Sequence, residues 1–570
     1  MKYFLKKSKL KNGIYLQIYE SYYDAKKKYG AHRSYKALGY VEKLKAQGIE
    51  DPIAFYTEEV KRLNGELAEE KEARKAKQIS EETPEKLAGY FPIKGINESI
   101  NVKGHLDLMQ SVMGFKFNLY EMISALIYAR VVQPCSKLRT YSEVLPKLAE
   151  KYDFSLGQIY DGLGYIGSEY EKVIEIYKHQ LQRKYTFKTD KTYFDCTNFY
   201  FEIDREDDFR RKGPSKENRH EPIVGLGLLL DANQIPIGMK MYPGNESEKP
   251  VMRDIIDGLK KTHGISGRTI TVADKGLNCA NNIVHALLKG DGYLFSKSVK
   301  TLPEKEKVWV LLENDYKEIK DAKGKVLYKI KECVDDFEYT VTDVNGKPKK
   351  VALKEKRIAT YNPDLAQKQL HEIDREIEKA QALKLSQAKK SEFGDCSKYV
   401  NFVPADKKGT TTDGKVVVTL NETAIAAAKD LAGYNLLVTS EISMPASEIY
   451  STYHNLWRIE ESFRIMKSEL DARPVYLQKK ETITGHFLIC FLAVLLVRIF
   501  QFKILDNKNS SSELFGLFRD FKVVKIAENE YINLSRRTSF IETLAEKTGL
   551  PLLSFYFKQS DLNHILSFKF

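Results

Sequence analysis

Cysteine is scarce in this chain of 570 residues: there are six, and no two of them form a CxxC pair. Closely spaced cysteines are the usual ligands of zinc ribbons and the reactive groups of redox dithiols, so both kinds of site are disfavoured. Six scattered cysteines are also too few for a disulfide framework. The chain is therefore expected to work in a reducing compartment, the cytoplasm.

Long hydrophobic runs are absent as well. The longest apolar stretch is residues 487–497, and Arg498 follows it directly. A helix needs roughly 20 apolar residues to cross a bilayer, so this stretch predicts a buried helix and no membrane partner. The opening residues, MKYFLKKSKLKNG, have no apolar segment of signal-peptide length. No GxxxxGK[ST] loop occurs, which disfavours an ATP-driven activity.

What the chain has in excess is positive charge. Lysine and arginine number 91 against 78 aspartates and glutamates, giving a formal net charge of +13. A basic chain of this size is typical of proteins with a polyanionic partner, usually nucleic acid. A basic protein that is simply soluble has the same composition, so charge alone leaves both interpretations open.

Changes of pattern along the chain predict six segments in an α/β protein. The central pattern is a mixed sheet with helices, interrupted by a β-rich insertion and preceded by a helical region. For that helical region, a DNA-binding module and a plain helical bundle fit the pattern about equally. The predicted segments are 1–90, basic strands and helix; 91–188, helical; 189–300, the first part of the α/β domain; 301–430, the β-rich insertion with a charged helix; 431–505, the second part of the α/β domain; and 506–570, helical.

One predicted amphipathic helix carries two parallel rows of side chains. In LWRIEESFRIMKSEL, residues 456–470, apolar side chains recur every three or four positions, as on the core face of a helix. A second row at the same spacing lies beside it and consists of Tyr453, Trp457, Glu460, Arg464 and Lys467. An aromatic ring, a carboxylate and two cations in line indicate a functional edge rather than a scattered solvent face.

Two aspartates stand at the ends of hydrophobic strands, Asp195 in TYFDCT and Asp274 in TVADKG. A carboxylate there is costly unless it is paired or holds a cation, although turns also favour aspartate. With Glu460 as a third carboxylate, the set predicts an oxygen-ligand site for Mg²⁺ of the kind used in phosphoryl transfer. Glu461 is an alternative third ligand, but it points roughly 100° further round the helix, so we favour Glu460.

The segment YHNLWRIEESFRIMK resembles the signature of bacterial insertion-sequence DDE transposases of the IS-four type: Tyr, two residues, Arg, three residues, Glu, six residues, Lys. Tyr453, Glu460 and Lys467 occupy matching positions, and Leu456 stands where the signature has arginine. The blocks YFDCTNFYFE, VADKGLNCANN and KGPSKENRHEPIVGLGLLLDANQIPIGMKMYPGNESE are also similar to that family. The resemblance extends over about residues 120–500.

The resemblance implies an RNase H-like catalytic domain in which Asp195, Asp274 and Glu460 are the catalytic residues and the ligands of Mg²⁺, with Mn²⁺ as a substitute. It also implies nicking, hairpin formation and strand transfer in cut-and-paste transposition, acting on double-stranded DNA of terminal inverted repeats and target. A homodimer in a synaptic complex and a place on the bacterial nucleoid are expected with it. The DNA phosphate contacts expected are Tyr453, Arg458, Arg464, Lys467 and Lys275, with Arg458 or Arg464 replacing the charge missing at Leu456.

Two alternatives remain open in the sequence. Trp309, in the insertion, is a candidate for stacking on an extruded base, although a tryptophan packed in the core is favoured. The whole chain is either an active transposase or a catalytically inactive, sequence-specific DNA-binding protein derived from one. The retained carboxylates, together with Tyr453 and Lys467, favour the active enzyme.

Overall fold

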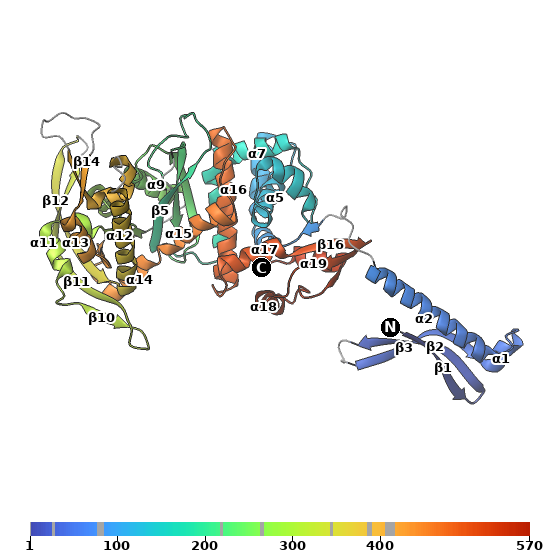
Figure 1. Cartoon of the computed structure of the whole chain (residues 1–570). Coiled ribbons are helices and arrows are strands. Elements are labelled where there is room, and N and C mark those ends of the chain that lie inside the picture. The colour runs from blue at the N-terminus through green and yellow to red at the C-terminus, as the bar shows by residue number, and fades with distance from the viewer. Residues whose placement is uncertain are drawn as a thin grey trace. The chain divides into compact units, whose positions relative to one another are not determined.

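The computed structural model describes residues 2–24, 29–76, 85–216, 220–262, 267–342, 346–384, 390–404 and 416–570. The chain divides into two compact units, Met1–Pro84 and Glu85–Phe570 (Figure 1). The smaller unit is an antiparallel sheet followed by helices. Its elements are β1 (Lys2–Leu10), β2 (Gly13–Asp24), β3 (Tyr29–Tyr40), α1 (Val41–Ala46) and α2 (Pro52–Ala76).

A sheet of nine strands forms the centre of the larger unit. Five of its strands run in the order β7-β6-β5-β8-β9; the first three are antiparallel, β8 is parallel to β5, and β9 is parallel to β8. This order and these directions are those of an RNase H-like sheet, so the predicted fold class is confirmed. The five strands are β5 (Lys191–Tyr200), β6 (Ile223–Leu230), β7 (Pro236–Pro243), β8 (Ile270–Ala273) and β9 (Gly292–Lys297).

Both faces of this sheet are covered, and β5 shows how. Its side chains alternate between two cores: Tyr193 and Phe199 belong to one, Phe194 and Cys196 to the other. Successive residues of a strand point to opposite faces, so Asp195 shares the first face with Tyr193 and Phe199. It is the one acidic residue of β5, beside the buried Thr197 on the same face.

Helices connect the parallel strands. The chain passes from β7 to β8 through α9 (Glu248–Thr262) and from β8 to β9 through α10 (Ala280–Leu288). Helix α9 was not predicted from the sequence, although its apolar residues recur at helical spacing, and Met252 and Ile256 pack into the second core. A crossover to a parallel strand needs a connection of about a dozen residues, usually a helix, and α9 supplies it.

The insertion extends the central sheet instead of forming a separate one. The strands β10 (Lys317–Lys320), β11 (Val326–Thr342) and β12 (Pro348–Tyr361) continue its edge through β15 (Tyr434–Thr439) to β9. The fully buried Glu355 links the strands of the insertion to the central sheet. It accepts hydrogen bonds from Tyr293 on β9 and from Tyr339 on β11, and it forms an ion pair with Arg357 at 2.7 Å. The charged helix predicted for this insertion is α12 (Pro363–Lys384).

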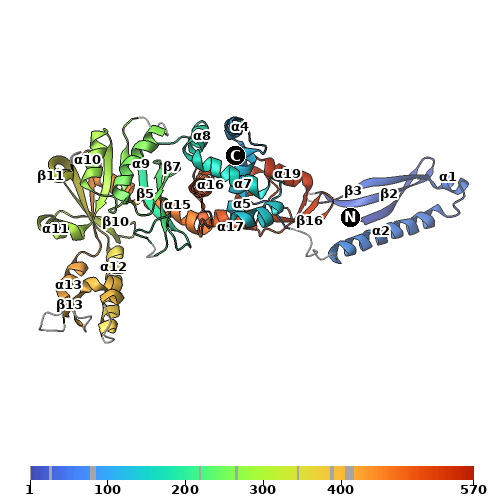
Figure 2. The same cartoon turned by 90° about the horizontal axis from the view of Figure 1, so that it is seen from above.

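The other elements of the insertion surround this edge. Together α12, α13 and β13 project away from the sheet around a small core of their own (Figure 2). These elements are α11 (Glu304–Leu311), α12 (Pro363–Lys384), β13 (Val400–Pro404), β14 (Val416–Leu420) and α13 (Glu422–Asp430).

The predicted helical region packs around α16 (Lys480–Ile499), whose residues from Ile483 onward are buried (Figure 1). The segment Lys480–Ile504 is long and apolar enough to cross a membrane, but its apolar stretch is buried inside the molecule, so it is a core helix, as the sequence predicts. Gly485 permits close packing, since a Cβ there would collide with the backbone of Leu163. The surrounding helices are α3 (Phe91–Glu98), α4 (Val102–Met113), α5 (Leu119–Val132), α6 (Lys137–Arg139), α7 (Leu156–Ser168) and α8 (Tyr170–Gln182).

The last segment is only partly helical. Besides three helices it contributes three short strands to a sheet with β4 (Glu85–Leu87). The helical prediction for 506–570 missed the hairpin β16–β17, whose turn holds Asn529 at φ +60°. The elements are α17 (Ser511–Asp520), β16 (Lys522–Ala527), β17 (Glu530–Asn533), α18 (Ser539–Thr548), β18 (Tyr556–Lys558) and α19 (Gln559–Ser567).

Candidate active site

The two aspartates lie side by side on neighbouring parallel strands. In the pairing of β5 with β8, Tyr193 stands opposite Val272, and both aspartates follow two residues later. Continued by two residues, this register places Asp195 opposite Asp274, on the same face of the sheet. Adjacent strands are about 4.8 Å apart, so the fold brings together two carboxylates that are 79 residues apart in sequence.

Glu460 approaches the aspartates from a helix. It lies on α15 (Trp457–Arg464), which packs on β5. Burial first, and then the charge of Asp274, raise the pKa of Glu460. Burial likewise raises the pKa of Asp195 to about 6, with Glu248 and Asp274 adding to the effect. The three carboxylates therefore share one electrostatic environment, in which their negative charges repel.

Lys216 partly compensates this negative charge, although no sequence pattern singled it out. Its ammonium lies 3.8 Å from Oδ1 of Asp195 and 3.3 Å from Oε1 of Glu248, and it also donates to the carbonyl oxygen of Cys196. The residue comes from the loop between β5 and β6, in the block KGPSKENRHE. That block resembles the transposase family, but no chemical role could be read from it.

Tyr453 lies beside Asp274. Its hydroxyl donates to Oδ1 of Asp274 at 3.0 Å, and the hydroxyl of Ser296 donates to the same oxygen at 3.3 Å. Burial and the charge of Asp274 raise the pKa of Tyr453, so the phenol stays protonated and acts as a donor. In this structure, Tyr453 contacts the carboxylate of Asp274, and its predicted contact with phosphate stays a prediction.

The helix that carries these residues is not continuous, contrary to the sequence pattern. Tyr453 lies on α14 (Ala446–His454), a turn at residues 455–456 follows, and Glu460 lies on α15. The last turn, Ile465–Glu469, is a π-helix. The row of side chains predicted along one straight helix is therefore distributed over three short pieces, although Tyr453 and Glu460 both still face Asp274.

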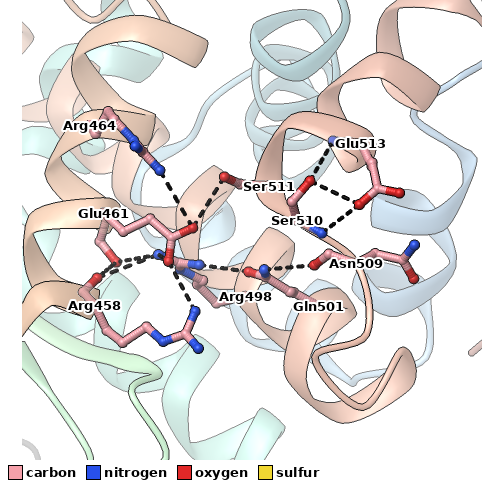
Figure 3. A network of polar contacts seen from close by, with 10 residues as sticks. Arg458, Glu461, Arg464, Arg498, Gln501, Asn509, Ser510, Ser511 and Glu513 are labelled. Atoms are coloured by element: carbon pink, nitrogen blue, oxygen red, sulfur yellow. Dashed lines mark hydrogen bonds and ion pairs between the residues drawn. The ribbon is translucent and has the colours of Figure 1, made fainter. Parts of the chain in front are cut away.

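Glu461 has a different environment from its neighbour (Figure 3). It is buried and lies 3.0 Å from Arg498 and 3.3 Å from Arg458, while Ser511 donates to it at 3.2 Å. Although burial opposes ionisation, the two guanidinium groups hold the pKa of Glu461 below its usual value. A carboxylate engaged in this way is unavailable to a metal ion or to DNA, which leaves Glu460 as the carboxylate facing Asp274.

The predicted arginines differ in exposure. Arg458 forms an ion pair with Glu461 and stacks on Trp457. Its guanidinium carbon lies 3.7 Å from the centre of the Trp457 ring. Arg464 has a side chain 68% exposed and only a long contact of 3.8 Å with Glu461. Leu456, which takes the place of the signature arginine, is buried. Of the two arginines, Arg464 is the one placed to reach a ligand in solvent.

Three further predicted side chains lie around this region or in the insertion. Lys467 has its ammonium 5.4 Å from the ring centre of Phe199 on β5, and Lys275 is exposed just after β8. Trp309 is half-buried on α11 against the second core, with the ammonium of Lys331 5.0 Å from its ring centre. Its role in stacking on a base stays a prediction.

The donor set suits a divalent cation. Three carboxylates supply the hard oxygen ligands that Mg²⁺ prefers. Burial first, and then neighbouring carboxylates, raise the pKa values of Asp195 and Glu460, and a bound cation would lower them. As the side chains stand, no group of three His, Cys, Asp or Glu residues in the described ranges is close enough to enclose an ion. The three carboxylates therefore suit Mg²⁺ by their ligand chemistry and by their positions on the sheet and on α15.

Comparison with known proteins gives one family match. The family model described as "Transposase DDE domain" matches residues 186–496, just over half of the chain. No curated protein matches the chain. Among solved structures, it is similar to a piggyBac transposase synaptic complex with hairpin DNA, with 10% identity, coverage of 75% of this chain and 78% of that chain, and a TM-score of 0.36. A TM-score this low does not support the transfer of any feature.

Proposed function

The chain belongs to the transposase DDE domain family, and from this premise we propose that it cuts and rejoins DNA at the ends of an insertion sequence of the IS-four type. Asp195, Asp274 and Glu460 are the proposed catalytic residues. The observation that carries the proposal is the register of β5 and β8, which sets the two aspartates side by side, with Glu460 electrostatically coupled to Asp274.

The chemistry proposed is in-line displacement at a phosphodiester. A divalent cation such as Mg²⁺, or Mn²⁺ in its place, held by the three carboxylates, would supply the positive charge that stabilises the attacking and leaving oxygens. Tyr453 and Ser296 both donate to one oxygen of Asp274 and so fix the orientation of that carboxylate. Lys216 does the same for Asp195 by ion pairing.

The finer steps and partners belong to the same proposal. Nicking, hairpin formation and strand transfer would accomplish cut-and-paste transposition of double-stranded DNA, with the exposed Arg464 and Lys275 placed to contact phosphate. Two transposon ends must be held together for this, which favours a homodimer. The net charge of +13 is consistent with DNA as the partner and with a location on the bacterial nucleoid.

A cleavage assay on linear transposon-end DNA with Mg²⁺ tests this function. Asp274→Asn and Glu460→Gln keep the size of each side chain and remove its charge. Because a metal centre contributes several kcal/mol and each 1.36 kcal/mol is tenfold in rate, we expect cleavage to fall by about 10³-fold or more with DNA affinity retained. Asp208→Asn is the matched control, since its carboxylate lies fully in solvent, and it should cut at the wild-type rate.

Wild-type rates for Glu460→Gln would contradict the assignment. A wild-type protein that binds end DNA but never cuts it would favour the second candidate, an inactive DNA-binding protein derived from a transposase. The observation in favour of that candidate is Leu456, the one position where the signature segment departs from the family pattern.

A further inference from the structure

A cavity of about 540 Å³ lies apart from the carboxylates, where α5 and the short helix α6 meet α16 and the segment that follows η5, the π-helical turn Ile465–Glu469. Its lining includes Arg130, Lys137, His486, Tyr160 and Tyr476. The cations come from the helical region and His486 from the central core helix. The proposed catalytic mechanism uses none of these residues.

The cavity holds two buried cations without a counter-ion. Arg130 and Lys137 are only 4% and 5% exposed. Lys137 contacts Nδ1 of His486 at 3.1 Å, and Arg130 donates to the carbonyl oxygens of Leu470 at 3.3 Å and Asp471 at 3.5 Å. In the described part of the chain, no carboxylate oxygen lies within 4.0 Å of either charged group.

Burying two charged groups without a counter-ion destabilises the folded protein when no ligand is bound. A buried charge is normally paired, because desolvation costs several kcal/mol that a neutral partner does not recover. Burial, reinforced by Arg130, lowers the pKa of Lys137 well below its usual value. Burial also lowers the pKa of His486, whose Nε2 contacts the carbonyl oxygen of Ala472, so the ring is neutral and orients Lys137.

We propose that this cavity binds a phosphate group of the DNA backbone, with Arg130 and Lys137 supplying the charge. A phosphate offers several anionic oxygens, which suit a guanidinium and an ammonium that converge on one cavity. The inference rests on the proposed function, because it takes the DNA to be a transposon end. The carboxylate of Asp471, which also lines the cavity, is exposed and lies outside ion-pair distance of both cations.

The position of the cavity also fits this role. Arg130 binds the backbone at Leu470 and Asp471, where the helical segment that carries Glu460 ends. The cavity therefore adjoins the end of the helical segment that carries Glu460.

The test is Lys137→Met in the full-length protein, which keeps the length of the side chain and removes its charge. Inorganic phosphate, added against chloride at equal ionic strength, should raise the melting temperature of the wild type and leave that of the variant unchanged. The variant should bind transposon-end DNA about tenfold more weakly, with the slope of log K against log salt reduced by about one. Without phosphate it should melt at or above the wild-type temperature.

Lys94→Met is the matched control, because Lys94 is equally buried but paired with Glu98 and with Glu150 at 3.3 Å. It should lower the melting temperature and leave DNA affinity unchanged. The proposal is overturned if Lys137→Met melts below the wild type, if its affinity for DNA equals that of the wild type, or if phosphate stabilises it as much. These measurements need no cleavage, so Glu460→Gln protein should give the wild-type phosphate response even where the catalytic assignment fails.

Discussion

Two buried clusters of charged side chains lie next to the helical segment that carries Glu460. They differ in whether the cations have a carboxylate partner. Around Glu461, two arginines and a serine satisfy one carboxylate, and Arg498 is completely buried (Figure 3). Around Lys137, two cations share a cavity without a carboxylate in contact. The first cluster pairs its carboxylate within the protein, although Nε of Arg498 has no hydrogen-bond partner in the described part of the chain, whereas the second cluster has no anion of its own.

The proposed catalytic carboxylates are the negative counterpart of the second cluster. Asp195, Asp274 and Glu460 repel one another, and Lys216 compensates them only in part. Buried polar groups that satisfy each other hold the architecture in place, while groups left unbalanced mark where a ligand belongs. On this basis Glu461 and Glu460, adjacent in sequence, have opposite roles.

Breaking the balanced cluster should give the largest loss of stability. Arg498→Met leaves Glu461 buried without its closest partner, and removing one member of a buried ion pair costs about 3–5 kcal/mol. We therefore expect a melting temperature lower by many degrees, measured by calorimetry. This is the opposite sign from Lys137→Met, where the charge removed has no partner.

Two variants sharpen this test. Arg464→Met removes a guanidinium that also faces Glu461, but from a side chain 68% exposed, so the loss should stay within about 1 kcal/mol. The double variant Arg498→Met with Glu461→Leu removes both charges and should recover most of the lost stability. Equal melting temperatures for Arg498→Met and Arg464→Met would show that the cluster around Glu461 is not structural.

The carboxylate site should make stability depend on pH. The pKa of Asp195 is about 6 in the folded chain and about 3.9 when unfolded, so between these values the folded state binds more protons. Stability then falls as pH rises from 4 to 6, by up to about 3 kcal/mol, and stays lowered above pH 6. Asp195→Asn removes this penalty and should melt above the wild type at pH 7.5 but not at pH 4.5.

Adding Mg²⁺ separates this effect from an ordinary buried acid. A cation that binds the folded site stabilises it by mass action, so Mg²⁺ should raise the melting temperature of the wild type at pH 7.5 more than that of Asp195→Asn. Asp208→Asn, whose carboxylate is in solvent, should follow the wild type under every condition. Identical responses to Mg²⁺ in wild type and Asp195→Asn would contradict the proposed ligand role.

The sequence predicted what depends on local pattern. The buried strand that ends just before Asp274 and the buried helix after His486 are present, and the RNase H-like sheet is confirmed, but Asp195 lies in the middle of β5 and not at its end as predicted. Periodicity is strong in these segments because one or both faces are buried. Helix α9 was missed although its apolar residues recur at helical spacing and the crossover that it completes needs a connection there.

Contacts between distant segments could not be predicted. Lys216 beside Asp195, and Lys137 against His486, join residues 21 and 349 positions apart, and lysine is too common on surfaces to single out either of them. The break between α14 and α15 was also missed, since residues 453–470 keep helical spacing across the turn. The choice of Glu460 over Glu461 rested on helix geometry and stays a prediction, and the structure adds that Glu461 is paired with Arg498 and Arg458.

Removing the hydroxyl of Tyr453 should have the smallest effect. Tyr453→Phe takes away one of the two donors to Oδ1 of Asp274 and leaves Ser296 as the other. A hydrogen bond to a charged group contributes about 1.5–3 kcal/mol, and the remaining donor offsets part of this, so cleavage should slow by about tenfold. A role in orienting Asp274 predicts a lower kcat with DNA affinity and its salt dependence unchanged. A role in holding phosphate predicts weaker binding instead, so a cleavage series read together with a salt titration distinguishes the two.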